Sequence, residues 1–478
     1  MPAPNAVPRL AALLCLLAAG VGGSLYADLF GSSASVCTEQ SPLGAPCLCP
    51  REQSRLHQGA DCSDRQIAEL PAELELPDGI PSVSFQQNRI AEVKRDQFRY
   101  NAAVEVLRLS KNRIAAVGPR AFSNLPGLEL LLLDKNGLAE IDATAFEGLT
   151  RLARLDLGFN QLRTLEPSLF SGTAIRELQL HYNPLVTLAP DTMLFLPQLQ
   201  KIDLDSTDLS ELPAELFASC PHLITLLVPH NRLTEIPHQT LRRAAGLRHL
   251  DLSGNQLQTV PAGAFAECPE LRRLVLSSMK TLQRVEGHAF SGLDQLEELL
   301  CQFNPALTEV DASAFRHEGS ERFLASLQLV DLKENALTQL SAELLPWSSV
   351  EFIDLEMNPW TCDCELEWVT GVNHSFKQEP LFKCSEPPTV SGRAIHTLKA
   401  EEFVCEDEGA NIALIVCLTL LGVGVAAGLI FALWKFNVCE TMEKKLTTRP
   451  KYGAVPVRSH PDKIEVEGLE WDRNDIGV

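Results

Sequence analysis

Three aspartates lie close together near the middle of the chain, at Asp203, Asp205 and Asp208. Carboxylate oxygens are the ligands that calcium prefers, so a calcium site is one interpretation of this spacing. The other interpretation is a solvated acidic edge, because the chain carries a formal net charge of −21 and acidic side chains usually stay in water. We favour the solvated edge and predict no metal site.

Histidines are the second group that could do chemistry, because imidazole titrates near neutral pH. His181, His230 and His249 lie in the same part of the chain. A catalytic histidine needs a nucleophile within hydrogen-bond reach, and none is obvious from the sequence. We therefore expect surface histidines, no enzyme activity and no cofactor. A pH-dependent switch in ligand binding is the alternative interpretation.

The elements that position these residues are short repeats. The pattern Leu-x-x-Leu-x-Leu-x-x-Asn-x-Leu recurs with steps of 23 to 25 residues and one step of 31. Such self-similarity is the signature of a solenoid. The ninth position of the pattern is occupied, in chain order, by Asn88, Asn112, Asn136, Asn160, Asn183, Thr207, Asn231, Asn255, Met279, Asn304, Asn335 and Asn358.

Each repeat predicts one short strand, as in "LDLGFNQLRTL" around Asn160. Alternate leucines face inward, and the strands of successive repeats form a parallel sheet. The chain turns after the strand, where an asparagine amide can both donate to and accept from buried backbone groups. We therefore expect a ladder of structural asparagines. Thr207 could keep part of this bonding, whereas Met279 could not.

A second column of residues supports the same solenoid. Phenylalanines lie ten or eleven residues beyond the ladder position, which predicts an aromatic spine behind the sheet, with a cofactor-binding box as the alternative. The extra residues after Met279 predict irregular loops over about 279–325. The phenylalanines are Phe98, Phe122, Phe146, Phe170, Phe217, Phe265, Phe290 and Phe315.

Over about residues 37–405 these repeats resemble the typical class of extracellular leucine-rich repeat proteins. The resemblance implies an α/β-type leucine-rich repeat solenoid, a curved parallel β-sheet horseshoe with a mostly irregular convex side. Members bind proteins more often than small molecules, which implies a cell-surface receptor, adhesion molecule or co-receptor. An innate immune pattern-recognition co-receptor, or a presenter of a secreted growth factor, is the alternative.

Of the fourteen cysteines, Cys15 lies in the expected signal peptide, and Cys417 and Cys439 lie in or next to the second long apolar run, near the C-terminus. Four others directly precede the repeats and four directly follow them. Both ends of a solenoid expose its core, and disulfides hold small covers together outside the cell. Zinc binding is the rival interpretation. "NPWTCDCELEWV" and the later cysteines resemble the family's C-terminal cap, and the N-terminal set has the family's Cys-x-Cys core. The resemblance implies the pairs Cys362–Cys384, Cys364–Cys405, Cys37–Cys49 and Cys47–Cys62.

Three further cysteines lie inside the repeats. Cys220 and Cys268 take matching places two repeats apart, a separation of roughly 10 Å for stacked strands, which is beyond the reach of a disulfide. Cys301 takes an inward place of a strand. We expect all three to be buried free thiols that act as small hydrophobic residues.

Two apolar runs indicate the relation to the membrane. The run "LAALLCLLAAGV" within residues 1–27 predicts a secretory signal peptide. Ile412 to Trp434 has 23 residues and no charge, which is enough to cross a bilayer. Acidic residues precede this run and Lys435, Lys444 and Lys445 follow it, so the tail is expected in the cytoplasm. The sequence therefore predicts a type I single-pass protein of the plasma membrane.

These features divide the chain into seven segments. In the last of them, residues 435–478, the acidic and basic residues balance, so the net negative charge lies in the residues before it. This negative charge excludes broad binding of nucleic acid. The segments are a signal peptide 1–27, an N-terminal cap 28–79, about twelve repeats 80–357, a C-terminal cap 358–405, a short stalk 406–411, a transmembrane helix 412–434 and a disordered cytoplasmic tail 435–478.

Short motifs add weaker expectations, each of which could also arise by chance. Asn373 begins the glycosylation sequon of the cap. Gly424 and Gly428 form a small-residue pair that would let two transmembrane helices pack as a homodimer or with a co-receptor. Tyr452 to Val455 resembles a sorting signal, which implies an adaptor and endosomal cycling. The terminal Ile476 to Val478 resembles a ligand of a PDZ groove.

The residue before each ladder asparagine points outward, and two successive repeats place aromatic residues there, Phe159 and Tyr182. His181 lies beside Tyr182, and Lys111 and Lys135 occupy the same column on one side. Exposed aromatic residues with basic neighbours are typical of a protein-binding hot spot. We predict that these five residues bind an extracellular protein ligand. The alternative is that the two rings fold over the rim and shield the turn.

Overall fold

The computed structural model describes residues 36–37, 41–43, 46–49, 59–404 and 408–446. The chain forms two compact units, Met1–Cys405 and Glu406–Val478. The predicted signal peptide and the tail motifs at Tyr452, Val455, Ile476 and Val478 lie outside the described residues.

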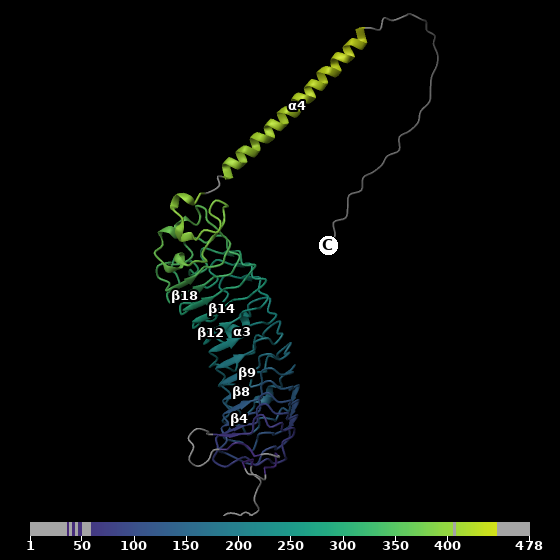
Figure 1. The fold of residues 1–478 in the computed structure, drawn as a ribbon, viewed down its shortest axis with the longest axis vertical. Helices are drawn as coiled ribbons and strands as arrows, with labels where there is room; N and C mark the ends of the chain where they lie inside the picture. The colour runs from purple at the N-terminus through teal and green to yellow at the C-terminus, as the bar shows by residue number, and fades with distance from the viewer. Residues whose placement is uncertain (1–35, 38–40, 44–45, 50–58, 405–407, 447–478) are drawn as a thin grey trace, which may run out of the picture. The chain divides into compact units, whose positions relative to one another are not determined.

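The first unit is built on a parallel sheet of thirteen three-residue strands, stacked in chain order (Figure 1). Neighbouring strands pair residue for residue, as Leu131 with Leu155 and Leu155 with Leu178. The strands are β1 (Gly59–Asp61), β2 (Ser82–Ser84), β4 (Val106–Arg108), β6 (Leu130–Leu132), β8 (Arg154–Asp156), β9 (Glu177–Gln179), β10 (Lys201–Asp203), β11 (Thr225–Leu227), β12 (His249–Asp251), β14 (Arg273–Val275), β16 (Glu298–Leu300), β18 (Leu329–Asp331) and β19 (Phe352–Asp354).

The predicted solenoid is therefore confirmed, with one more strand than the twelve ladder positions. The extra strand is β1, which lies in the segment expected to be the N-terminal cap. In every strand of this sheet the middle residue is buried, while the residues on either side are partly or fully exposed, except for Asp331 of β18, which is buried. We call the outward side of this sheet, together with the residues that follow each strand, the sheet face.

The asparagine ladder is confirmed by its hydrogen bonds. Asn160 donates from Nδ2 to the carbonyl oxygens of Leu157 (2.9 Å) and Leu133 (3.0 Å), and its Oδ1 accepts from the Leu138 amide (3.0 Å). One side chain thus satisfies backbone groups of two successive repeats. Thr207 keeps part of this pattern, because its hydroxyl donates to the Leu204 carbonyl at 2.8 Å.

Met279 interrupts the ladder as expected. Its side chain is fully buried and offers no amide. Its own backbone amide still donates to Oδ1 of Asn304 at 2.8 Å. The Nδ2 of Asn304 in turn lies 3.4 Å from the Cys301 sulfur, within its own repeat. The Asn304 side chain therefore keeps its Oδ1 link to the preceding repeat, whereas the donation from Nδ2 to a carbonyl of that repeat, as Asn160 makes, is absent among the described residues.

The aromatic spine is confirmed as two stacks of buried rings. Ring centroids are 6.0 Å apart for Phe98 and Phe122 and 6.4 Å apart for Phe265 and Phe290. Met193 and Leu241 take the corresponding places in two central repeats, and both are buried. The spine is thus continuous as an apolar core but not as a run of aromatic rings.

The side opposite the sheet is more regular than expected in places. Two small parallel sheets lie there, one of β3 (Glu92–Val93), β5 (Ala116–Val117) and β7 (Glu140–Ile141), the other of β13 (Thr259–Val260), β15 (Arg284–Val285) and β17 (Glu309–Val310). The prediction of irregular loops over 279–325 is therefore wrong for β15 and β17. The added residues bulge out after them, where Arg316 and Phe323 pair in an antiparallel bridge. The short helices η1 (Pro167–Phe170) and α3 (His238–Arg242) complete this side.

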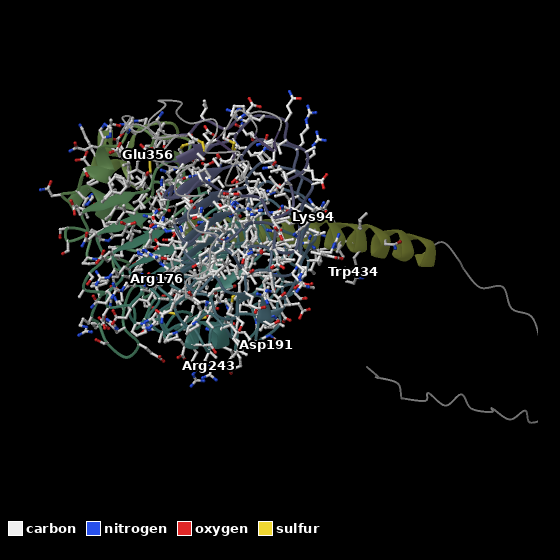
Figure 2. The ribbon with its side chains drawn as sticks, turned by 90° about the horizontal axis from the view of Figure 1, so that it is seen from below. Lys94, Arg176, Asp191, Arg243, Glu356 and Trp434 are labelled. Carbon is white, nitrogen blue, oxygen red and sulfur yellow. A yellow bond between two sulfur atoms is a disulfide. The ribbon has the colours of Figure 1, made fainter. Side chains whose placement is uncertain are left out.

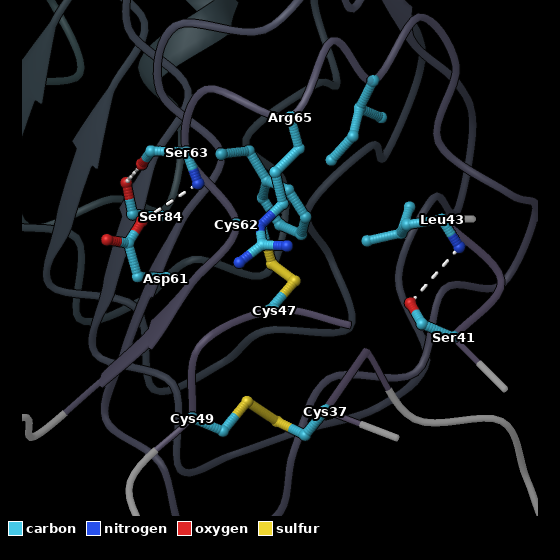
Figure 3. Close-up of a disulfide and its surroundings, with 12 residues drawn as sticks. Cys37, Ser41, Leu43, Cys47, Cys49, Asp61, Cys62, Ser63, Arg65 and Ser84 are labelled. Carbon is cyan, nitrogen blue, oxygen red and sulfur yellow. Dashed lines mark hydrogen bonds between the residues drawn. A yellow bond between two sulfur atoms is a disulfide. The ribbon is translucent and has the colours of Figure 1, made fainter. Parts of the chain in front are cut away.

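Disulfides close both ends of the solenoid. The predicted pairs Cys37–Cys49 and Cys47–Cys62 are confirmed (Figure 3), as is Cys362–Cys384. Cys364 is also disulfide-bonded, while its predicted partner Cys405 lies outside the described residues. The C-terminal cap contains β20 (Trp360–Thr361), η2 (Glu367–Gly371), η3 (Ser375–Gln378), β21 (Cys384–Glu386), η4 (Ile395–Thr397) and η5 (Ala400–Glu402).

The second unit contains one long helix, α4 (Glu408–Leu446). Its stretch Cys417–Lys435 is long and apolar enough to cross a membrane by length and composition. The helix includes residues 408–411 of the expected stalk and residues 435–446 of the expected disordered tail. Gly424 and Gly428 lie on it with nothing within 4 Å of an added Cβ atom.

Candidate ligand-binding surface

One column of the sheet face has an unusual backbone. The residue before the ladder position adopts a left-handed conformation in every repeat, with φ of 54° at Phe159, 53° at Tyr182 and 67° at Gly254. For a residue other than glycine this conformation costs roughly 1–2 kcal/mol. The turn that directs the following side chain into the ladder imposes this backbone conformation. The side chains of this column therefore point outward, and their residue type is not restricted by the core.

Two rings in this column form a flat stack. The ring centroids of Phe159 and Tyr182 lie 4.4 Å apart with an interplanar angle of 5°. Both remain exposed, by 40% and 47% respectively. Lys135, one repeat earlier in the column, places its Nζ 5.1 Å from the Phe159 centroid, within cation–π range. Both rings therefore present part of their area to solvent. We call Lys135, Phe159, Tyr182 and His181 the aromatic platform.

His181 lies differently from the sequence expectation of a surface histidine. Its side chain is 18% exposed, and its ring meets Phe159 edge-on, with centroids 5.2 Å apart. Gly158 makes this possible, because a Cβ atom at that position would lie 2.4 Å from Cε1 of His181. The histidine thus fills the space of a missing side chain and supports the rings from the side. His230 and His249 are exposed, as expected.

Buried charge surrounds His181. Its Nδ1 has no hydrogen-bond partner among the described residues and lies 3.7 Å from Oδ2 of Asp203. Burial raises the pKa of Asp203, an effect opposed by the hydrogen bond from the Asp205 amide. Burial likewise raises the pKa of Asp156, against the bond from the Gly158 amide. The centre of the sheet face therefore holds carboxylates whose charged form a nearby cation would stabilise.

The two lysines predicted to flank the rings differ in their contacts. Lys135 touches Phe159, whereas Lys111 is exposed and makes no contact with either ring in the described residues. Lys111 and Arg108 form no ion pair in the described part of the chain. Two cations without a carboxylate partner among the described residues thus lie at this end of the sheet face, beside a centre that holds the carboxylates of Asp156 and Asp203.

The acidic trio does not converge on one point. Asp205 accepts from Ser206 Oγ at 2.8 Å and lies 2.9 Å from His230 Nδ1. Asp208 pairs with Arg232 at 2.6 Å. Across the described residues, no group of three or more acidic, histidine or cysteine side chains could hold a metal ion.

A hollow on the sheet face was not foreseen from the sequence. This hollow has a volume of about 290 Å³ and lies over β11, β12 and β14. A separate cavity of about 420 Å³ lies in the C-terminal cap. The floor of the hollow on the sheet face holds Asp251, between Leu227 and Val275, with His249 and Arg273 beside them. The signal was present: apolar residues occupy outward strand places at 227 and 275, where polar residues are expected.

The remaining predicted residues are the three cysteines inside the repeats and the glycosylation sequon. Cys220, Cys268 and Cys301 are buried free thiols, as predicted, and burial raises the pKa of each to about 12. Asn373 is exposed in the C-terminal cap. Charged residues such as Asp191 and Arg243 lie at the outer surface of the repeats (Figure 2).

A family profile described as leucine rich repeat matches the chain in six overlapping windows, 82–138, 126–185, 173–233, 197–257, 221–280 and 247–305. A phospholipase A2 inhibitor of Gloydius brevicaudus siniticus is 32% identical over 85 residues, which is 17% of this chain and 25% of that protein. The match thus spans a quarter of the relative's length.

Solved structures share the fold at low identity. A complex of Latrophilin 3, Unc5D and FLRT2 matches with a TM-score of 0.52 and 21% identity, over 74% of this chain and 97% of that chain. The Toll–Spatzle complex of Drosophila matches with a TM-score of 0.50 and 20% identity, over 71% of this chain and 54% of that chain. The disulfides and this type of solenoid are typical of proteins located outside the cell or at its membrane.

Proposed function

We propose that this chain, whose residues 82–305 match a leucine rich repeat profile, is a cell-surface receptor or adhesion molecule built on a scaffold for protein interactions. It binds an extracellular protein ligand on the sheet face. The observation that carries this proposal is the aromatic platform, where two stacked and exposed rings adjoin a cation. Such rigid aromatic area is where interface energy concentrates.

The proposal includes a topology. Residues 1–27 act as a signal peptide, the segments 28–405 lie outside the cell, α4 crosses the plasma membrane and the tail is cytoplasmic. The disulfides and the apolar stretch of α4 support this arrangement. Asn373 then carries an N-glycan, so Asn373→Gln should abolish the mobility shift that glycosidase treatment produces. An unchanged shift would contradict this orientation or this site. Dimerisation through Gly424 and Gly428, adaptor binding at Tyr452 and PDZ capture at Val478 are further proposals.

The binding site is tested with the full-length chain on cells, stained with a library of secreted and cell-surface proteins. For a partner found in this way, the double change Phe159→Ala/Tyr182→Ala should weaken binding by at least about 2 kcal/mol, or about 30-fold. Phe303→Ala is the matched control, because Phe303 has the same left-handed backbone and 41% exposure. Unchanged affinity of the double variant would move the site elsewhere.

The nature of the partner separates the candidate roles. A partner on neighbouring cells favours adhesion. A soluble secreted protein favours a presenter or a co-receptor, and a microbial product favours an innate immune role. The Toll–Spatzle complex, which shares the fold, is described as a hub in development and innate immunity.

A further inference from the structure

The aromatic platform has one covered face and one open face. Its members follow one another in successive repeats, in the order Lys135, Phe159, Tyr182. The lysine ammonium covers the outer face of the Phe159 ring at 5.1 Å, and the two rings cover each other. The next residue in the column is Ser206, whose side chain is too short to reach over a ring. In the described residues, the ring contacts of Tyr182 are those with Phe159 and His181, so no further ring or cation covers its second face, and the residue is 47% exposed.

The space above Ser206 is bounded on its far side by His230. The His230 ring extends over Gly254, where an added Cβ atom would lie 2.6 Å from its Cδ2. The ring thus lies between Gly254 of the following repeat and Asp205 of the preceding one, whose Oδ1 is 2.9 Å from its Nδ1. Tyr182 and His230 are two repeats apart, which is roughly 10 Å for stacked strands. A planar group can enter between them.

A carboxylate faces this space. The Oδ1 atom of Asp205 is held by Ser206 Oγ and His230 Nδ1, at 2.8 and 2.9 Å. Its Oδ2 has no hydrogen-bond partner among the described residues, and the side chain is 25% exposed. The buried carboxylate of Asp203 adds negative potential from the preceding strand end. The Tyr182 amide donates to the Asp205 carbonyl oxygen at 2.8 Å, so the ring and this carboxylate belong to neighbouring positions of adjacent repeats.

We propose that this slot binds an arginine side chain of the protein ligand. The guanidinium stacks on the open face of Tyr182 and donates to Asp205, so that it mirrors what Lys135 does on Phe159. Arginine fits better than lysine, because its guanidinium is planar, stacks on rings and is weakly hydrated. This inference rests on the proposed function, since it names the chemistry of the ligand at the same platform.

The test uses a phage-displayed library of random peptides, panned against the full-length chain in nanodiscs and counter-selected against the Tyr182→Ala variant. The surviving peptides should contain arginine, and replacing that arginine with citrulline should weaken binding at least tenfold. Asp205→Asn should weaken binding in the same direction, and Phe303→Ala should leave it unchanged. Thermal unfolding of each variant checks that the fold is intact.

A second variant closes the slot from within. Ser206→Lys should place a cation over Tyr182, as Lys135 does over Phe159, and should abolish peptide binding without loss of thermal stability. The column already accepts lysine at two left-handed positions, Lys111 and Lys135.

The outcomes distinguish this inference from the proposed function. Peptides that need Phe159 and Tyr182 but carry no arginine, or bind equally well with lysine, overturn the arginine slot and leave the protein-binding platform standing. Undiminished binding by Ser206→Lys also overturns the slot. An absence of peptides that depend on Tyr182 contradicts both.

Discussion

Gly158 lies directly against the imidazole of His181, so that an added Cβ atom would stand 2.4 Å from Cε1. Gly158→Ala should therefore displace the histidine and destabilise the fold by about 1–3 kcal/mol, the usual cost of overpacking. In the His181→Ala background the same change should cost less than about 0.5 kcal/mol, because the clash is gone. Thermal unfolding of the two single variants and the double variant measures this coupling.

Gly137→Ala provides the control for that cycle. Gly137 has the Ile114 carbonyl oxygen at 3.7 Å from an added Cβ atom, an ordinary contact. Equal destabilisation by Gly158→Ala in the presence and absence of His181 would show that the glycine is needed for its backbone and not for the ring.

The C-terminal cap should depend on its disulfides. Removing a native disulfide from a small extracellular unit costs about 2–5 kcal/mol. Cys384→Ser breaks the bond to Cys362 and should leave the chain retained inside the cell. Cys301→Ala removes a buried thiol without breaking a bond and should cost less. Surface staining of cells compares the two, and equal surface levels for Cys384→Ser and the unaltered chain would contradict the prediction.

Acid should stabilise the fold through Asp203. Burial raises its pKa in the folded protein, so the folded state holds this proton more tightly than the unfolded chain does. That stabilisation is fully present below the unfolded pKa of about 3.9 and is lost as pH rises through the folded value. Asp203→Asn cannot ionise, yet its Oδ1 can keep the bond from the Asp205 amide at 3.0 Å. The variant should therefore unfold at a higher temperature than the unaltered chain at pH 7, and the difference should shrink toward pH 4.

Asp311 supplies a control of opposite sign. Hydrogen bonds from the Ser313 hydroxyl and amide lower the pKa of this carboxyl. Its contribution to stability is present above the unfolded pKa and is lost as pH falls through the folded value. Asp311→Asn should thus lower the unfolding temperature at pH 7. A stabilising effect of Asp311→Asn, or a destabilising one of Asp203→Asn at pH 7, would refute this account.

The three thiols inside the repeats should be inert in the folded protein. With a pKa of about 12 each, they are thiolate in only about 1 in 10,000 molecules at pH 8, and the thiolate is the reactive form. An alkylating reagent should leave Cys220, Cys268 and Cys301 unmodified until denaturant is added. Peptide mapping by mass spectrometry identifies each site, and modification of Cys268 under native conditions would contradict its burial.

Features set by the repeat period could be predicted from the sequence, because each depends on one residue type returning at one position. The asparagine ladder, the apolar spine and the break at Met279 belong to this class. Three disulfides were also correctly paired, through resemblance to a family. The sequence also predicted that the residues before the ladder positions point outward, but it did not predict their left-handed backbone conformation.

Features that depend on the pairing of different residues in successive repeats could not be predicted. His181 is half-buried because its neighbour one repeat earlier is Gly158, and neither residue alone indicates this. The hollow at Asp251 requires Leu227 on one side and Val275 on the other. The small strands at 284–285 and 309–310 have only two residues each, which is too short for a periodic pattern to be recognised.

The break at Met279 has a consequence for how the solenoid comes apart. In a stack where each repeat contacts only its neighbours, stability is close to a sum of nearest-neighbour terms, and folding propagates along the stack. Asn304 keeps one side-chain bond to the preceding repeat, from the Met279 amide, but its Nδ2 turns to the Cys301 sulfur instead of to a carbonyl of that repeat. This junction therefore has fewer side-chain bonds than the one at Asn160, and we expect it to divide the array into a longer N-terminal and a shorter C-terminal cooperative block. We expect a force applied between the two ends to separate the blocks there, so the repeats that carry the aromatic platform would stay folded after the C-terminal repeats have opened.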